Sequence, residues 1–230
     1  MKEDARRTKI ICTIGPASEN RIKELSAAGM DIARINTAYT SKTKIDFENV
    51  MVDVRHWKLI PDFELPKRGV VALSFVRSGE CVKNARECTS HPICAKIETK
   101  DAVKNLGEIV RESDLIMIAR GDLGKEFGVH LVPLLQERII LECKRKEKPF
   151  IVATEVLASM LSNPFPTRAE AVDVFTAVRE GAYGIMLAEE TAIGKYPVEA
   201  TKWLRSLIDA AENRCDVFSL NANSFCSDVK

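Results

Sequence analysis

The chain has 230 residues, of which 46% are hydrophobic and 29% are charged, and its formal net charge at pH 7 is +1. This length fits one α/β domain, and the near-neutral charge argues against a nucleic-acid-binding surface. No run reaches the roughly 18 apolar residues that a membrane span requires. The N-terminus is charged but has no apolar stretch behind it. We therefore expect a cytoplasmic protein with no membrane or nucleic-acid partner.

Eight short apolar runs that favour β-strands follow one another along the chain. They are 8–14, 31–35, 49–54, 69–76, a run that begins at 92 and carries Lys96 and Glu98 near its end, 115–119, 150–154 and 183–187. Helical patterns separate most of these runs. The predicted helices are 19–28 with Ser18 as N-cap, 43–47, 79–88, 100–111, 131–146, 167–179 and 197–213.

The alternation of strands and helices implies a parallel sheet, and eight units without a ninth imply closure into a single-domain (β/α)8 TIM barrel. We assign residues 1–214 to this barrel and 215–230 to a polar C-terminal tail. Between the third and fourth strands, Pro61 and Pro66 predict a short or irregular connection. The seven cysteines show no CxxC or Cys/His pairing, so we interpret them as reduced thiols rather than metal ligands.

Polar side chains gather where the predicted strands end. They are Arg34 and Asn36, Asp53, Lys96 and Glu98, Asp122, Thr154, and Glu190 in the loop after the last strand. Because the active sites of TIM barrels lie on the loops after the strands' C-terminal ends, this convergence predicts an active site. Taken singly, Asp53 or Glu190 would more often be structural.

Lys96 and Glu98 are two residues apart in a strand, so their side chains share one face. Asp122 follows the next strand, which gives two carboxylates that face one cation beside an amine. Hard divalent ions held by one or two carboxylates, with other positions left to a substrate, are typically Mg²⁺ or Mn²⁺.

Several longer motifs carry a resemblance to a known family. The blocks are TKIICTIGPAS at 8–18, GMDIARIN at 29–36, SFVR at 74–77, AKIE at 95–98, IARGDLGKE at 118–126, KPFIVATEVLASM at 148–160, PTRAEAVDV at 166–174 and IMLAEETAIGKYPVEA at 185–200. In this order the chain resembles the barrel domain of pyruvate kinase. The resemblance implies Mg²⁺-dependent phosphoryl transfer between phosphoenolpyruvate and ADP, giving pyruvate and ATP in glycolysis.

The resemblance also implies roles for individual residues. Glu98 and Asp122 would ligate the divalent cation. Lys96 would stabilise the transferring phosphoryl group and the enolate, and Arg34 would hold phosphate. The amides around Gly121 and Asp122 would receive the substrate carboxylate, and Thr154 would lie near the proton-transfer face of pyruvate. A carboxylate at a short helix's N-terminus suits the dipole there.

The chain departs from the family pattern in two blocks. Thr37, Ala38 and Tyr39 follow Asn36 where the family has Phe-Ser-His after its Asn, and Val54-Arg55-His56-Trp57 follows Asp53 where the family has Thr-Lys-Gly-Pro. Only Asn36 and Asp53 remain of the usual oxygen donors to K⁺, so we expect that monovalent site to be weakened or absent. From this resemblance we expect the segment 56–68 in place of the family's lid domain and no regulatory domain after the barrel.

Three interpretations therefore stay open. The chain is a pyruvate kinase homologue slowed by the missing lid, or a metal-dependent decarboxylase or aldolase that forms a pyruvate enolate without nucleotide, or a non-catalytic paralogue that binds a keto acid. The expected partners are small molecules, and a homo-oligomer is left open. Arg120 is interpreted as a salt bridge at the barrel rim, and Glu170 as part of a helix cap.

Overall fold

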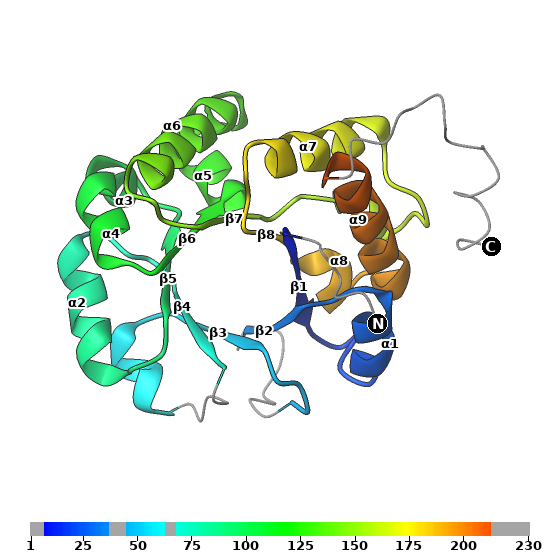
Figure 1. The fold of residues 1–230 in the computed structure, drawn as a ribbon, viewed down its shortest axis with the longest axis horizontal. Helices are drawn as coiled ribbons and strands as arrows, with labels where there is room; N and C mark the ends of the chain where they lie inside the picture. The colour runs from blue at the N-terminus through cyan, green and yellow to red at the C-terminus, as the bar shows by residue number, and fades with distance from the viewer. Residues whose placement is uncertain (1–6, 37–44, 63–67, 213–230) are drawn as a thin grey trace.

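The computed structural model describes residues 7–36, 45–62 and 68–212 of the chain. Eight parallel strands form a closed barrel in sequence order, with β8 paired to β1 (Figure 1). The predicted (β/α)8 TIM barrel is therefore confirmed. The strands are β1 Lys9–Ile14, β2 Ile32–Asn36, β3 Val50–Val54, β4 Val70–Leu73, β5 Ile93–Ile97, β6 Leu115–Ala119, β7 Phe150–Ala153 and β8 Gly184–Leu187.

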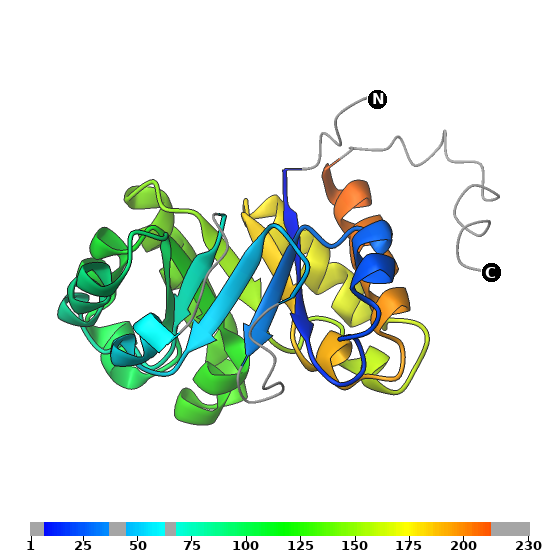
Figure 2. The same cartoon turned by 90° about the horizontal axis from the view of Figure 1, so that it is seen from below.

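The helices surround the barrel, and the side view shows α5 (green) and α8 (orange) at the edge toward which the strands point (Figure 2). The α-helices are α1 Ile22–Ala28, α2 Gly79–Cys88, α3 Lys100–Lys104, α4 Leu106–Glu112, α5 Arg120–Phe127, α6 Val132–Arg145, α7 Arg168–Arg179, α8 Glu189–Ala192 and α9 Pro197–Glu212. Three 3₁₀ segments, Trp57–Asp62, Val129–Leu131 and Ala158–Leu161, lie in the loops. No helix within the described ranges is long and apolar enough to cross a bilayer.

Alternating strand residues bury two separate apolar layers. Side chains such as Ile11, Met51 and Met117 fill the barrel interior, whereas Ile10, Val52 and Ile116 pack outward against the helices. This alternation follows from the period of two in a strand, and it explains why barrel strands are apolar on both faces. The barrel is therefore a packed core that leaves room for a site only at its ends.

Three helix predictions were wrong in detail. Ser18 does not cap a helix, because residues 15–20 form turns in which the Ser18 amide donates to the Gly15 carbonyl, and α1 begins only at Ile22. The predicted helix 43–47 lies partly outside the described residues, and its described part, 45–47, is not helical. The stretch 100–111 breaks at Asn105, whose side-chain amide donates to the Arg77 carbonyl at 2.7 Å.

The cysteines of the described residues are all free thiols. They are Cys12, Cys81, Cys88, Cys94 and Cys143. Cys12 and Cys94 are buried in the strands as expected, and burial raises the pKa of the Cys12 thiol to about 12. A thiol with so high a pKa is almost never a thiolate at neutral pH, and so Cys12 acts as a small apolar core residue. The assignment of 215–230 to a tail concerns residues outside the described ranges.

Helix α7 begins with a capping box. The Thr167 hydroxyl accepts from the Glu170 amide, and the Glu170 carboxylate accepts from the Thr167 amide. Glu170 also receives the amide and hydroxyl of Ser159 at 2.7 and 2.6 Å, which ties the loop after β7 to the helix. The predicted capping role of Glu170 is therefore confirmed.

Removing this cap should destabilise the protein measurably. Thr167→Ala should lower the free energy of unfolding by about 1 kcal/mol, because the Glu170 amide loses its acceptor. The matched control is Thr176→Ala, the same change at an exposed position inside α7. Urea denaturation followed by circular dichroism measures both; equal stabilities of the two variants would contradict the capping argument.

Candidate active site

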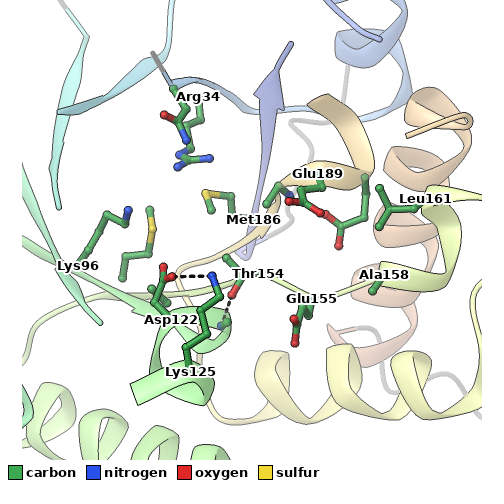
Figure 3. Close-up of a pocket in the computed structure, with 16 residues that line it drawn as sticks. Arg34, Lys96, Asp122, Lys125, Thr154, Glu155, Ala158, Leu161, Met186 and Glu189 are labelled. Atoms are coloured by element: carbon green, nitrogen blue, oxygen red, sulfur yellow. Dashed lines mark hydrogen bonds and ion pairs between the residues drawn. The ribbon is translucent and has the colours of Figure 1, made fainter. Parts of the chain in front are cut away.

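A cavity of about 260 Å³ lies at the C-terminal ends of the strands. Figure 3 shows Lys96 on one side of it and Glu189 and Leu161 toward the other. The predicted site residues that line the cavity are Arg34, Asn36, Lys96, Gly121, Asp122, Thr154 and Glu190. Asp53 and Glu98 do not line it but lie buried behind its wall. The residues predicted to meet at the strand ends therefore do lie together in space. They form two layers, one that lines the cavity and one buried behind it.

Asp53 is the centre of the buried layer. Its Oδ2 accepts from Arg34 Nη2 at 2.5 Å and lies 3.2 Å from Lys96 Nζ, while its Oδ1 accepts from the Ser74 hydroxyl at 2.7 Å. Arg34 is fixed further by a 2.9 Å bond from its Nη1 to the Thr13 hydroxyl. The pairing of Asn36 with Asp53 between β2 and β3 sets this register.

These contacts determine the ionisation of Asp53. Burial acts to raise its pKa, but the charge of Arg34, then that of Lys96, outweighs burial and holds the pKa below its usual range. The carboxylate is therefore ionised and its oxygens are bonded to cations and a hydroxyl. This arrangement does not suit a monovalent metal ion, because Arg34 and Lys96 already supply the positive charge that K⁺ would bring.

Lys96 joins the buried layer to the cavity. Its amine contacts Glu98 Oε2 at 3.2 Å, a contact that is possible because Lys96 and Glu98 are two residues apart and point the same way. The amine also donates to the Ser74 hydroxyl at 2.8 Å. Glu98 Oε1 accepts from the Phe75 amide at 2.5 Å. Burial raises the pKa of Glu98, although Lys96 and the Phe75 amide act in the opposite direction.

Asp122 is the carboxylate that faces the cavity. It stands in the first turn of α5, and its Oδ1 lies 3.1 Å from Lys125 Nζ, a contact drawn in Figure 3. Its side chain is 42% exposed, so this ion pair contributes little to stability. Among the described residues, no group of three or more His, Cys, Asp or Glu could hold a metal ion. Of the two carboxylates predicted as ligands, Asp122 lines the cavity and Glu98 lies behind its wall, while Glu155 and Glu189 also line it. A pair such as Glu98 and Asp122 fits an ion that completes its shell with substrate oxygens and water.

Thr154 and Arg120 shape the β7 side of the cavity. Thr154 has a positive φ of 67°, and its hydroxyl accepts from the Gly121 amide at 2.7 Å while donating to the Ala153 carbonyl at 2.6 Å. A substrate carboxylate at Gly121 would therefore compete with this hydroxyl. Arg120 binds both oxygens of Asp173 and donates to the Thr154 carbonyl at 3.1 Å, which confirms the rim salt bridge.

Glu190 is a structural carboxylate rather than a reacting one. It is 2% exposed, and its oxygens accept from the amides of Val156, Leu157 and Ala188 at 2.8 to 3.2 Å. These bonds tie the loop after β7 to the loop after β8. The sequence placed Glu190 at the correct rim, but its role is to hold the rim together.

Sequence reasoning missed three residues of this end of the barrel. Ser74 bridges Asp53 and Lys96, Thr13 anchors Arg34, and Lys125 pairs with Asp122. Ser74 opens the SFVR block and Thr13 lies on the same strand face as Ile11. The two-residue period of the strand therefore places Thr13 on the interior face, so its position could have been predicted. The contact of the Ser74 hydroxyl with Asp53 and Lys96 depends on how neighbouring strands align, which the sequence alone does not give.

A closed (β/α)8 barrel whose charged cavity lies at the C-terminal strand ends has the arrangement of TIM-barrel enzymes. Comparison with known proteins identifies the family. The family model described as pyruvate kinase, barrel domain, matches residues 65–201. The chain therefore belongs to the pyruvate kinase family.

Curated relatives agree with this assignment. The chain is 48% identical over 152 residues to pyruvate kinase of Thermotoga maritima, covering 64% of this chain and 33% of that protein. It is 39% identical over 215 residues to pyruvate kinase of Methanocaldococcus jannaschii, covering 91% of this chain and 45% of that protein. Pyruvate kinase of Mycobacterium tuberculosis is 39% identical over 212 residues, with 88% and 41% covered. The chain thus spans less than half the length of these relatives.

The buried layer predicts a large effect of a small substitution. Asp53→Asn keeps the size of the side chain but leaves Arg34 and Lys96 buried without their shared counter-charge. The free energy of unfolding at pH 7 should fall by roughly 3–5 kcal/mol. The control is Asp209→Asn, which removes one carboxylate from an exposed pair with Arg205 and should cost less than about 1 kcal/mol.

The pH dependence of the same variant has a defined sign. Because the folded-state pKa of Asp53 is lower than its ordinary 3.8, its contribution is complete above that pH and is lost as the pH falls through the folded-state value. The stability difference between wild type and Asp53→Asn should therefore shrink on acidification. Denaturation curves across this range measure it; a difference that grows toward low pH would refute the assignment.

Proposed function

We propose that the chain catalyses Mg²⁺-dependent phosphoryl transfer between phosphoenolpyruvate and ADP, giving pyruvate and ATP. The observation that carries this proposal is the cavity itself, where the cationic side chains of Arg34 and Lys96 lie in one wall and Asp122 and Thr154 in another. The membership in the pyruvate kinase family supports it.

The reaction needs positive charge at fixed positions. Phosphoryl transfer passes through a loose transition state with charge spread over the equatorial oxygens, and the product is an enolate before it is protonated. Lys96 is 11% exposed at its side chain and is held by Asp53, Glu98 and Ser74, so its amine is positioned before substrate arrives. Such preorganised charge needs little rearrangement during the reaction. Arg34, braced by Asp53 and Thr13, binds phosphate in the same way.

Glu98 and Asp122 would hold the divalent cation. When bound, Mg²⁺ supplies Lewis-acid stabilisation to the enolate and phosphoryl oxygens. In the structure each of these carboxylates is paired with a lysine, Glu98 with Lys96 and Asp122 with Lys125, so a lysine amine balances the negative charge of each. Carboxylates balanced in this way remain able to accept a cation.

Thr154 is placed for the protonation step. Its hydroxyl lines the cavity, and its proton is directed to the Ala153 carbonyl. Turned toward the cavity, that hydroxyl would pass a proton to the methylene carbon of the enolate while taking one from solvent water, so that no alkoxide remains. The Gly121 amide, bonded to the same oxygen, keeps the hydroxyl at this position.

A second candidate function is supported by the connection between β3 and β4. Residues 55–69 alone join these strands, where relatives that bear a lid have a whole domain, so the nucleotide side of the reaction has less protein around it. Forming a pyruvate enolate requires no contacts to a nucleotide, because it needs only the metal, Lys96 and a binding site for the substrate carboxylate. Decarboxylation of oxaloacetate is the corresponding nucleotide-independent reaction.

Three assays separate these functions: phosphoryl transfer, exchange of the pyruvate methyl protons, and decarboxylation of oxaloacetate. The purified protein with phosphoenolpyruvate, ADP and Mg²⁺ should form pyruvate slowly, because water is poorly excluded without a lid. It should also exchange the methyl protons of pyruvate with solvent, and Lys96→Met should lose both activities. Proton exchange and oxaloacetate decarboxylation without any phosphoryl transfer would support the second function. The absence of all three activities would leave only the non-catalytic keto-acid-binding interpretation.

The metal assignment has its own test. Mn²⁺ should bind to the wild type in the presence of oxalate, and both Glu98→Gln and Asp122→Ala should abolish this binding, because each removes one of two carboxylate ligands. The matched control is Glu126→Ala, an exposed carboxylate of the same helix α5. Calorimetric titration measures the affinities; unchanged binding in Asp122→Ala would reject the site.

Monovalent ions should matter little. Since Arg34 and Lys96 already neutralise Asp53, replacing K⁺ by Na⁺ at constant ionic strength should leave any catalytic rate nearly unchanged. Steady-state rates in the two salts test this, with tetramethylammonium as a third, non-coordinating cation. A strong activation by K⁺ alone would show that Asn36 and Asp53 still form a monovalent site.

A further inference from the structure

Lys125 brings an exposed ammonium group into the active-site cavity. It belongs to α5, and it lines the cavity together with Asp122, which stands three residues earlier in the same helix. Residues three apart lie on one face of a helix, so the two side chains meet. The dashed line in Figure 3 marks their contact, 3.1 Å from Lys125 Nζ to Asp122 Oδ1. The amine therefore lies against a carboxylate that is assigned to the metal ion.

The two lysines beside the proposed metal ligands differ in how they are held. Lys96 is 11% exposed at its side chain and contacts Asp53 and Glu98 at the same time. The Lys125 side chain is 80% exposed, and its amine donates to Asp122. An exposed ion pair of this kind is weak, and the four-carbon stem of a lysine is flexible. Lys96 is therefore a fixed part of the wall, whereas Lys125 can leave its partner.

Other carboxylates keep the Lys125 amine near this place. The hydrogen bond to Asp122, and then the charge of Asp122, raise the pKa of Lys125, although burial acts in the opposite direction. The charges of Glu155 and Glu189, which line the same cavity, also raise it. The side chain is therefore a cation at neutral pH, and it is attracted to more than one carboxylate.

An adjoining cavity gives the amine a second place to lie. This cavity, of about 350 Å³, shares Gly121, Lys125 and Glu155 with the active-site cavity. Glu155 is exposed, so its carboxylate is open to an approaching cation. Rotation about the bonds of the lysine stem would carry the ammonium group from Asp122 toward Glu155 while the backbone of α5 stays in place.

We propose that the Lys125 ammonium group is a built-in competitor of the divalent cation, bonded to Asp122 before the metal ion binds and displaced toward Glu155 when it does. The inference rests on the proposed function, which assigns Asp122 as a metal ligand. A divalent ion beside the ammonium group would be repelled, and an amine that stayed on the carboxylate would occupy one of its oxygens. The native chain therefore binds its metal ion more weakly than its carboxylates alone would allow.

Calorimetric titration with Mn²⁺ in the presence of oxalate tests the competition. Lys125→Met has a side chain of similar length without the charge, and it should bind Mn²⁺ about fivefold more tightly than the wild type, since an exposed ion pair no longer has to be broken. Lys125→Arg keeps the charge and should bind Mn²⁺ no more tightly than the wild type. The matched control is Lys144→Met, the same change at an exposed lysine of α6 that lines neither cavity, and its affinity should equal that of the wild type.

Amine labelling measures the displacement itself. Acetylation with an N-hydroxysuccinimide ester, followed by mass spectrometry, gives a labelling rate for each lysine. Saturating Mn²⁺ and oxalate should raise the rate at Lys125, because its amine leaves Asp122. The rate at Lys144 in the same sample should not change, which controls for effects of the metal ion on the reagent.

The outcomes separate this inference from the proposed function. Wild-type affinity in Lys125→Met, or a labelling rate at Lys125 that Mn²⁺ does not alter, would overturn the inference and leave the metal site assigned. Binding of Mn²⁺ by Lys125→Met but not by the wild type would support the inference and count against metal-dependent catalysis by the native chain. The absence of binding in both proteins, with folding verified by circular dichroism, would overturn the metal assignment and the inference together.

Discussion

Two buried cations share the carboxylate of Asp53, and the end of the barrel that holds the cavity depends on this contact. Arg34 from β2, Lys96 from β5 and Ser74 after β4 all meet this one side chain from β3. Removing two positive charges from water is costly unless a counter-charge is close by. Asp53 supplies that counter-charge and holds the guanidinium and the amine at positions that the strands determine. The cost of burying these two side chains is therefore met by a contact that forms during folding.

The part of the cavity wall that follows β6, the neighbour of β5, has a different character. Asp122 is partly exposed and belongs to a helix that starts directly after β6, and its ion pair with Lys125 is a surface contact. Such contacts exchange partners at little cost. The cavity therefore combines buried cations with fixed positions and an exposed carboxylate whose ion pair can exchange for another partner.

The sequence predicted the barrel because the apolar runs are short, are eight in number and are mostly separated by helical patterns. The strand 115–119 was predicted with both ends correct, since charged residues, Asp114 and Arg120, bound it on each side. The break at Asn105 was not predictable, because its side chain serves a carbonyl from another loop. Asp53 was predicted at the right strand end but as a doubtful metal ligand. Its actual partners depend on the strand register and on a hydroxyl from the next strand, which a linear pattern does not contain.

Thr154 and Glu155 follow β7 with positive φ angles of 67° and 53°, a conformation that L-residues with side chains adopt at a cost. Arg120 holds both of their carbonyls and is itself held by Asp173. A replacement of Glu155 by asparagine or glycine would relieve the backbone and favour the folded state. The turn itself is held by Arg120, and the Thr154 hydroxyl by the Gly121 amide and the Ala153 carbonyl, so the hydroxyl would stay in place. Glu155 is therefore a position where selection for heat resistance would find a stabilising substitution.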